Sequence, residues 1–103
     1  MGPNAMNRET VIAKLREHEA ELKSEGITQL SLFGSVARGD ANAKSDVDLM
    51  AEFDHAKKMT LFGRVHIKNL MTDILGVTAD VSDKKMLPPE VLERAQRESI
   101  LVF

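Results

Sequence analysis

The chain contains no cysteine, tryptophan or tyrosine, and only four of its 103 residues are phenylalanine. Without cysteine there can be no disulfide and no thiolate metal site, a composition compatible with the cytoplasm, where we expect the protein to act. Few aromatic residues leave little for stacking on single-stranded bases. The net charge is -2 with both signs mixed, so the basic patch of a nucleic-acid-binding domain is also missing. We therefore expect no direct nucleic-acid partner.

Long apolar runs and targeting patterns are absent as well. No run is long enough for a transmembrane helix, and the N-terminus lacks the charged-then-apolar pattern of a signal peptide, so we expect no membrane partner. The length predicts one domain, over residues 6–103. Residues 1–5, before a second methionine at Met6, suit a cloning remnant and a native N-terminus equally.

Helical and strand periodicities, with turn residues between them, divide the rest of the chain into alternating elements. In chain order these are helix 8–25, strand 27–33, helix 35–38, strand 46–53, helix 61–75, strand 77–82, helix 88–98 and strand 100–103. Asn7 and Thr60 suit helix N-caps, and Gly26 and Gly76 suit helix ends. The order predicts an α/β (α+β) fold, a mixed sheet flanked by helices that lie over one face.

One apolar stripe makes 8–25 a single helix in this scheme. Its members are spaced to fall on one side of a helix: Val11, Leu15, His18 and Leu22.

Asp46 and Asp48 open the strand 46–53. Alternate side chains of a strand share a face, so the two carboxylates point one way while Val47 and Leu49 point into the core. Two carboxylates a few ångströms apart repel each other unless a cation lies between them. Hard oxygen ligands of this kind suit Mg²⁺ or Mn²⁺, so the pattern predicts a divalent metal site.

Gly34 and Ser35 follow the apolar end of strand 27–33. Gly34 allows the backbone to approach a ligand closely, and Ser35 starts a helix whose first N–H groups attract phosphate. Together with the aspartate pair, this turn predicts a site for a metal-bound nucleoside triphosphate.

These motifs resemble the signature of the DNA polymerase beta-like nucleotidyltransferases: Gly34-Ser35, ten residues, Asp46-Val47-Asp48, and a later acidic residue on a strand, here Asp80. The run from Gly34 to Asp40 is similar to that of the minimal nucleotidyltransferases, short prokaryotic proteins that act as antitoxins of HEPN-domain toxins. The likeness extends from about Leu30 to Phe103, most of the chain.

The resemblance implies the polymerase beta-like fold and an enzyme that transfers AMP from ATP to a tyrosine hydroxyl of a HEPN RNase toxin. It implies that Asp46, Asp48 and Asp80 are catalytic and hold two Mg²⁺ ions, with Mn²⁺ as a substitute. It also implies that Gly34 and Ser35 bind the nucleotide. Larger relatives carry helical domains for the acceptor, which this chain lacks, so a partner protein would bring the acceptor.

Two rival functions stay open at this point. The chain could be a non-catalytic antitoxin that binds its toxin, or a catalytic subunit that modifies a small molecule once a helical partner completes the site.

Several charged residues near these motifs have two interpretations. Arg38, one helical turn after Ser35, could contact a phosphate or pair with a carboxylate. Lys44 is a candidate for the nucleotide or a solvated side chain, and so are Lys84 and Lys85. Asp83 competes with Asp80 as the third carboxylate, but it falls outside the apolar alternation and suits the following turn.

Overall fold

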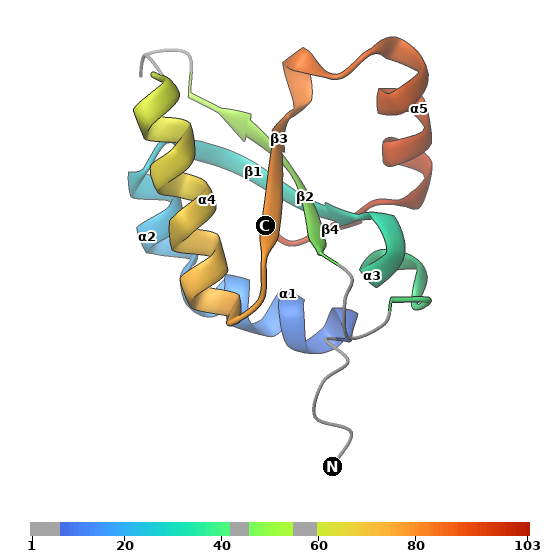
Figure 1. Ribbon diagram of the computed structural model, residues 1–103, viewed down its shortest axis with the longest axis horizontal. Coiled ribbons are helices and arrows are strands. Elements are labelled where there is room, and N and C mark those ends of the chain that lie inside the picture. The colour runs from blue at the N-terminus through green and yellow to red at the C-terminus, as the bar shows by residue number, and fades with distance from the viewer. Residues whose placement is uncertain (1–6, 42–45, 55–59) are drawn as a thin grey trace.

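The computed structural model describes residues 7–41, 46–54 and 60–103, and a four-stranded mixed sheet lies at its centre (Figure 1). The strand order is β3-β2-β1-β4. The strands are β1 (Ile27–Phe33), β2 (Val47–Phe53), β3 (Ala79–Asp83) and β4 (Ile100–Leu101). The helices are α1 (Arg8–Glu17), α2 (Glu19–Ser24), α3 (Gly34–Arg38), α4 (Leu61–Leu75), the 3₁₀ turn η1 (Lys84–Met86) and α5 (Pro89–Glu98).

The register of the strands separates an apolar face from a polar one. β1 runs antiparallel to β2 and pairs Leu32 with Leu49, while β2 runs parallel to β3 and pairs Leu49 with Val81. Residues one step along the strands point to the opposite face. That step brings Phe33, Asp48 and Asp80 into one row across β1, β2 and β3.

The apolar face forms the core under α1, α2 and α4. Its large, fully buried side chains come from both layers: Val11, Leu15, Leu22, Leu30, Leu32, Leu49, Ile67, Met71 and Leu75. Each such side chain contributes roughly 1.5–3 kcal/mol by leaving water. The core therefore fixes the register of β2, and that register holds Asp48 on the other face.

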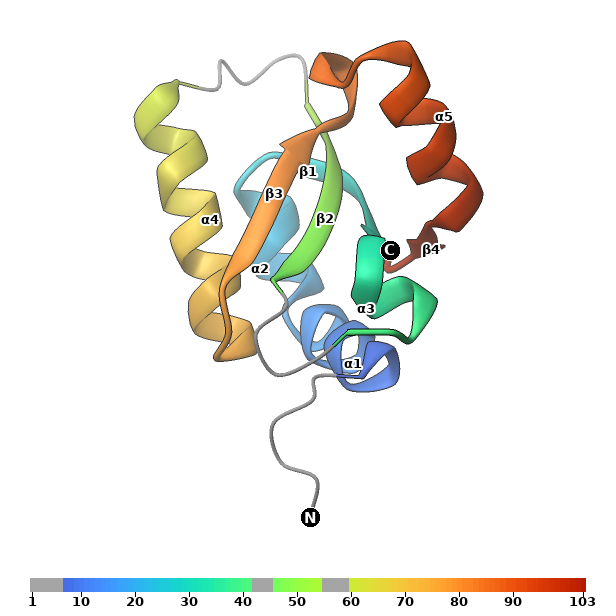
Figure 2. The same cartoon turned by 45° about the vertical axis from the view of Figure 1, so that its right-hand side comes forward.

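α5 lies across the strands from α4 in both views (Figures 1 and 2). It contacts β1 and α3, and its one fully buried apolar residue, Ala95, lies outside the main core cluster. The prediction that the helices cover one face is therefore wrong for α5. The sheet is flanked by helices on both sides, and α5 closes part of the side that carries the aspartates.

The predicted helix ends are confirmed where local chemistry determines them. The Asn7 side chain accepts a hydrogen bond of 2.8 Å from the Thr10 N–H, and the Thr60 hydroxyl accepts one of 3.0 Å from the Gly63 N–H. Gly76, the C-cap of α4, and Gly26, the residue after the C-cap Glu25 of α2, take positive φ angles. The two capping side chains therefore pair backbone N–H groups that the start of a helix leaves unpaired, and the two glycines adopt a backbone conformation that would strain other residues.

The single helix predicted over 8–25 is wrong, because it breaks at His18. The His18 N–H donates to the Leu15 carbonyl at 3.1 Å, a tighter turn than an α-helix makes, and the His18 ring is 2.9 Å from the Lys14 carbonyl. α2 then starts in a new direction while Leu22 stays buried.

Smaller differences affect the strands and the last helix. β3 begins at Ala79 rather than at residue 77 and continues to Asp83, and β4 is confined to two residues. Pro88 is the N-cap of α5 and not its first residue. Within the described ranges, no helix is long and apolar enough to cross a membrane.

Candidate active site

Asp48 and Asp80 are register partners on the parallel strands β2 and β3. Partners in a sheet point to the same face, so both carboxylates lie on the side opposite the core. Asp46 is exposed directly before β2, two residues from Asp48. Of the three residues that the sequence predicts together, the structure pairs Asp48 with Asp80, and Asp46 is near enough for its charge to raise the pKa of Asp48.

Gly34 lies directly against the Asp48 carboxyl group. Its φ is +78°, and a Cβ atom added to it would lie 3.0 Å from Cγ and 3.1 Å from Cβ of Asp48, and closer still to Oδ2. A side chain at position 34 would displace the carboxylate, so glycine meets two requirements here, the positive φ and the space. The turn between β1 and α3 and the strand β2 therefore form one site.

The Asp48 carboxyl group is more difficult to ionise than an ordinary aspartate. Burial raises its pKa first, and the negative charges of Asp80 and Asp46 raise it further, while Arg38 acts in the opposite direction. Burial disfavours the charged form of Asp48 by removing water from it, and the two neighbouring carboxylates add repulsion between like charges. The site thus has unfavourable negative charge that a bound cation would relieve.

These residues fit a divalent cation by the chemistry of the donor set. All three offer carboxylate oxygens, the ligands that Mg²⁺ and Mn²⁺ prefer. In the described part of the chain, however, no three such side chains already converge on one point. Without a cation between them, like-charged carboxylates repel each other and do not converge. A metal site of this type, with no ion bound, is therefore expected to hold its carboxylates near one another but apart.

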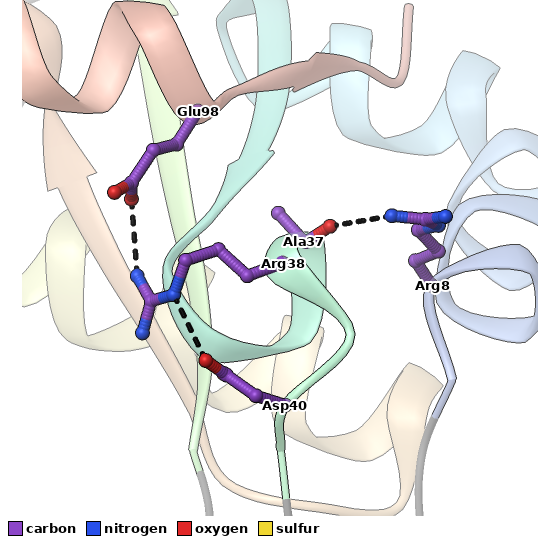
Figure 3. Close-up of polar contacts among 5 residues, drawn as sticks. All are labelled: Arg8, Ala37, Arg38, Asp40 and Glu98. Carbon is purple, nitrogen blue, oxygen red and sulfur yellow. Dashed lines mark hydrogen bonds and ion pairs between the residues drawn. The ribbon is translucent and has the colours of Figure 1, made fainter.

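Arg38 is engaged by two carboxylates at the rim of this face (Figure 3). Its Nε lies 3.2 Å from Asp40 Oδ2, and its Nη1 lies 3.0 Å from Glu98 Oε2. Hydrogen bonds to Asp40 and then Glu98 raise the pKa of the Arg38 guanidinium. Of the two interpretations left open by the sequence, the structure shows carboxylate pairing.

Of the other basic candidates, Lys84 places its Nζ 3.6 Å from Glu52, and the Lys85 backbone N–H donates to Asp83 Oδ1 at 3.0 Å. Lys44 lies outside the described residues. Asp83 is the last residue of β3 and, as the sequence predicted, also serves the following turn, where it is the N-cap of η1. Its register partner is Ala51 on the core side, and it pairs with Arg64 at 3.2 Å. It does not compete with Asp80 for the site.

Sequence reasoning missed Asp40 and Glu98. Asp40 was noted only as part of the motif, and Glu98 lies 60 residues from Arg38 at the end of a different helix. No pattern along the chain connects Glu98 to the site, since only the packing of α5 against α3 brings it there.

Residues 15–102 match the protein family described as Nucleotidyltransferase domain. Among relatives, the protein adenylyltransferase MntA of Thermococcus cleftensis is 27% identical over 95 residues, which are 91% of this chain and 94% of MntA. A candidate protein adenylyltransferase of Methanocaldococcus jannaschii is 30% identical over 88 residues, 84% of this chain and 88% of the relative.

Two solved structures extend the likeness to the fold. One of a candidate minimal nucleotidyltransferase has a TM-score of 0.76 and 35% identity, covering 92% of this chain and 95% of that one. A chain from the complex of a tri-AMPylated HEPN toxin of Shewanella oneidensis with an MNT antitoxin has a TM-score of 0.62 and 14% identity, covering 87% and 71%. The second likeness is one of fold alone. The predicted fold, a mixed sheet flanked by helices, is confirmed.

Proposed function

This chain belongs to the nucleotidyltransferase domain family and is a nucleotidyltransferase, and we propose that it transfers AMP from ATP to a tyrosine hydroxyl of a HEPN RNase toxin. The modified toxin would lose its RNase activity, so that the chain acts as an antitoxin. We also propose that residues 6–103 form a single minimal nucleotidyltransferase domain and that it works in the cytoplasm, where ATP and the RNA that the toxin cleaves are found.

One observation carries the proposal: Gly34 packs on Asp48 while Asp48 pairs in register with Asp80. A turn that allows close backbone approach therefore lies beside a group of carboxylates. Phosphoryl chemistry needs both parts, one to hold the triphosphate and one to neutralise the charge that develops around it.

The donor would lie over the Gly34–Ser35 turn. The exposed backbone of that turn offers N–H groups to the phosphate oxygens, and the Ser35 hydroxyl adds one more hydrogen bond. Arg38 follows one helical turn later and is near enough to lower the pKa of Asp48, so its charge also reaches the site. We place Lys44 with the nucleotide too, on its position in the sequence between Gly39 and Asp46.

Asp46, Asp48 and Asp80 would hold two Mg²⁺ ions, or Mn²⁺, which when bound offset the charge of the triphosphate and activate the acceptor hydroxyl. The acceptor oxygen attacks the α-phosphorus, a new P–O bond forms, the bond to the β-phosphate breaks, and pyrophosphate leaves. Asp80 is exposed beside Asp48 and can accept the proton of the attacking hydroxyl.

The relatives support a protein as the acceptor. MntA of Thermococcus cleftensis is named a protein adenylyltransferase, and the Shewanella oneidensis complex contains a HEPN toxin that carries three AMP groups. Asp46 and Asp80 are exposed, so a segment of another protein can reach their carboxylates. Docking need only be transient, because the modification is covalent.

The test is a titration of the RNase activity of the cognate HEPN protein against this chain. With ATP and Mg²⁺, amounts well below one per toxin should silence the RNase, and withholding ATP should abolish the effect. A one-to-one requirement that ignores ATP would show a toxin-binding antitoxin in place of an enzyme. Label from ATP on a small molecule and not on the toxin would indicate a catalytic subunit that modifies a small molecule together with a helical partner.

A further inference from the structure

We propose that Glu98 is a positioning residue for the nucleotide: it holds the Arg38 guanidinium at the rim of the carboxylate face and releases it when a triphosphate binds. The inference rests on the proposed function and deepens it. It assigns a role in nucleotide affinity to a residue of α5, the helix that lies across the sheet from α4.

The contacts of Arg38 define the starting state. One guanidinium edge reaches Asp40, in the segment that leads toward Asp46, and the other reaches Glu98 at the end of α5 (Figure 3). Two distant parts of the chain, α3 with the residues directly after it and the end of α5, therefore meet through one side chain. The guanidinium already has two carboxylate partners before any phosphate arrives.

The backbone that carries Arg38 is held firmly. The neighbouring Ala37 carbonyl accepts a hydrogen bond of 2.9 Å from Arg8 Nη1, and the Ser35 carbonyl accepts from the N–H groups of Gly39 and Asp40, each at 3.0 Å. Val36 and Ala37 are buried in the core. An exchange of partners by Arg38 therefore needs rotation of its long side chain and no movement of α3.

Both ion pairs are of the exchangeable kind. The side chains of Arg38 and Asp40 are 45% and 61% exposed, and that of Glu98 is 26% exposed. Ion pairs open to solvent are weak because water screens them. A triphosphate brings several negative charges and can accept two parallel N–H bonds from one guanidinium, so it competes well against single carboxylates.

Arg38 is already near the place where the phosphates would bind. It ends the same short helix α3 that Gly34 begins, and Gly34 touches Asp48; its positive charge offsets part of the rise in the pKa of Asp48. Glu98 acts against phosphate binding in two ways: it neutralises Arg38, and it places a negative charge beside an anionic ligand. Removing its charge while keeping its shape should therefore tighten binding.

The experiment measures the affinity of Mg²⁺–tripolyphosphate and of Mg²⁺–AMP-PNP by calorimetry. Tripolyphosphate reports on the phosphate site whatever the base preference is. Glu98→Gln should bind both about two- to fivefold more tightly than the wild type, the range expected for a solvent-exposed ion pair. The matched control is Glu93→Gln, which removes another exposed α5 ion pair, to Arg97, and should leave both affinities unchanged.

A double substitution tests whether Glu98 weakens phosphate binding through Arg38 or by direct charge repulsion of the phosphates. If Glu98 acts through Arg38, Glu98→Gln should give no gain in an Arg38→Gln background, because the two effects share one partner. The KM for nucleotide should fall in Glu98→Gln while kcat stays close to the wild-type value.

Three results would overturn the inference. They are equal affinities of Glu98→Gln and Glu93→Gln, weaker binding by Glu98→Gln, or a gain that persists without Arg38. If the wild type binds neither ligand, the proposed function fails together with this inference. Binding by the wild type with no response to Glu98→Gln removes only the role of Glu98.

Discussion

Gly34 and Asp48 are packed so closely that any side chain at position 34 would displace the Asp48 carboxylate. A Cβ on Gly34 would meet Oδ2, Cγ and Cβ of Asp48, and the φ of +78° at Gly34 is one that other residues rarely adopt. The contact joins the end of β1 to the start of β2. It ties the geometry of the proposed phosphate turn to that of the carboxylate beside it.

Gly34→Ala should remove activity more completely than it removes stability. The left-handed φ costs about 1–2 kcal/mol for a residue with a Cβ, and the Asp48 side chain must rotate away to make room. Gly76→Ala is the matched control, with φ +75° and nothing within 4 Å of a new Cβ. Urea denaturation should show a loss for both variants, larger for Gly34→Ala by the cost of displacing Asp48, whereas calorimetry should show loss of nucleotide binding for Gly34→Ala alone. Unchanged binding would remove the turn from the site.

Asp48→Asn should stabilise the protein without metal, and increasingly so as the pH rises. The pKa of Asp48 in the folded state is above its ordinary value of 3.8, so the folded state holds this proton more tightly than the unfolded state does. The wild type therefore loses stability as the pH rises from that ordinary value through the raised one, and the variant lacks this loss. Denaturation across the acid range measures the difference. Asp73→Asn, on the exposed side of α4, should run parallel to the wild type.

Loss of two carboxylates on the active face should weaken divalent metal binding. The double variant Asp48→Asn with Asp80→Asn should bind Mn²⁺ at least about tenfold more weakly, the loss that even an outer-shell substitution can cause. Asp83→Asn is the control on the same strand, since Asp83 faces the core side and pairs with Arg64. Titration followed by electron paramagnetic resonance reports the free ion. Equal affinity in the double variant and this control would exclude the site.

Thr60→Ala should lower the free energy of unfolding by about 1 kcal/mol, because it leaves the Gly63 N–H without its side-chain acceptor. Thr60→Ser keeps a hydroxyl in place and should recover most of the loss. Chemical denaturation with an unchanged slope would assign the effect to the helix cap. A loss as large in Thr60→Ser would point to the methyl group instead.

The sequence predicted those features that short stretches of chain determine. Asn7 and Thr60 cap helices through residues three positions away, and alternation along β2 places Asp48 opposite the core. The pairing of Asp48 with Asp80 was reachable too, because consecutive strand-helix-strand units form parallel neighbours.

Features that depend on packing between distant segments were not predictable. The break at His18 occurs without a helix-breaking residue at that position, and Leu22 is buried after the break just as Val11 and Leu15 are buried before it. The position of α5 across the sheet, and with it the pairing of Glu98 with Arg38, depends on tertiary contacts of β1 and α3. Glu98 and Arg38 are 60 residues apart, and no sequence pattern links residues at that separation.

The most direct test of the account is transfer of label from α-labelled ATP to the cognate HEPN toxin with Mg²⁺ present. The wild-type chain should label the toxin many times over per molecule of enzyme and silence its RNase activity in step with the label. Asp48→Asn should do neither, although it folds. Full inhibition of the RNase by both the wild-type chain and Asp48→Asn, with no label on the toxin, would contradict catalysis.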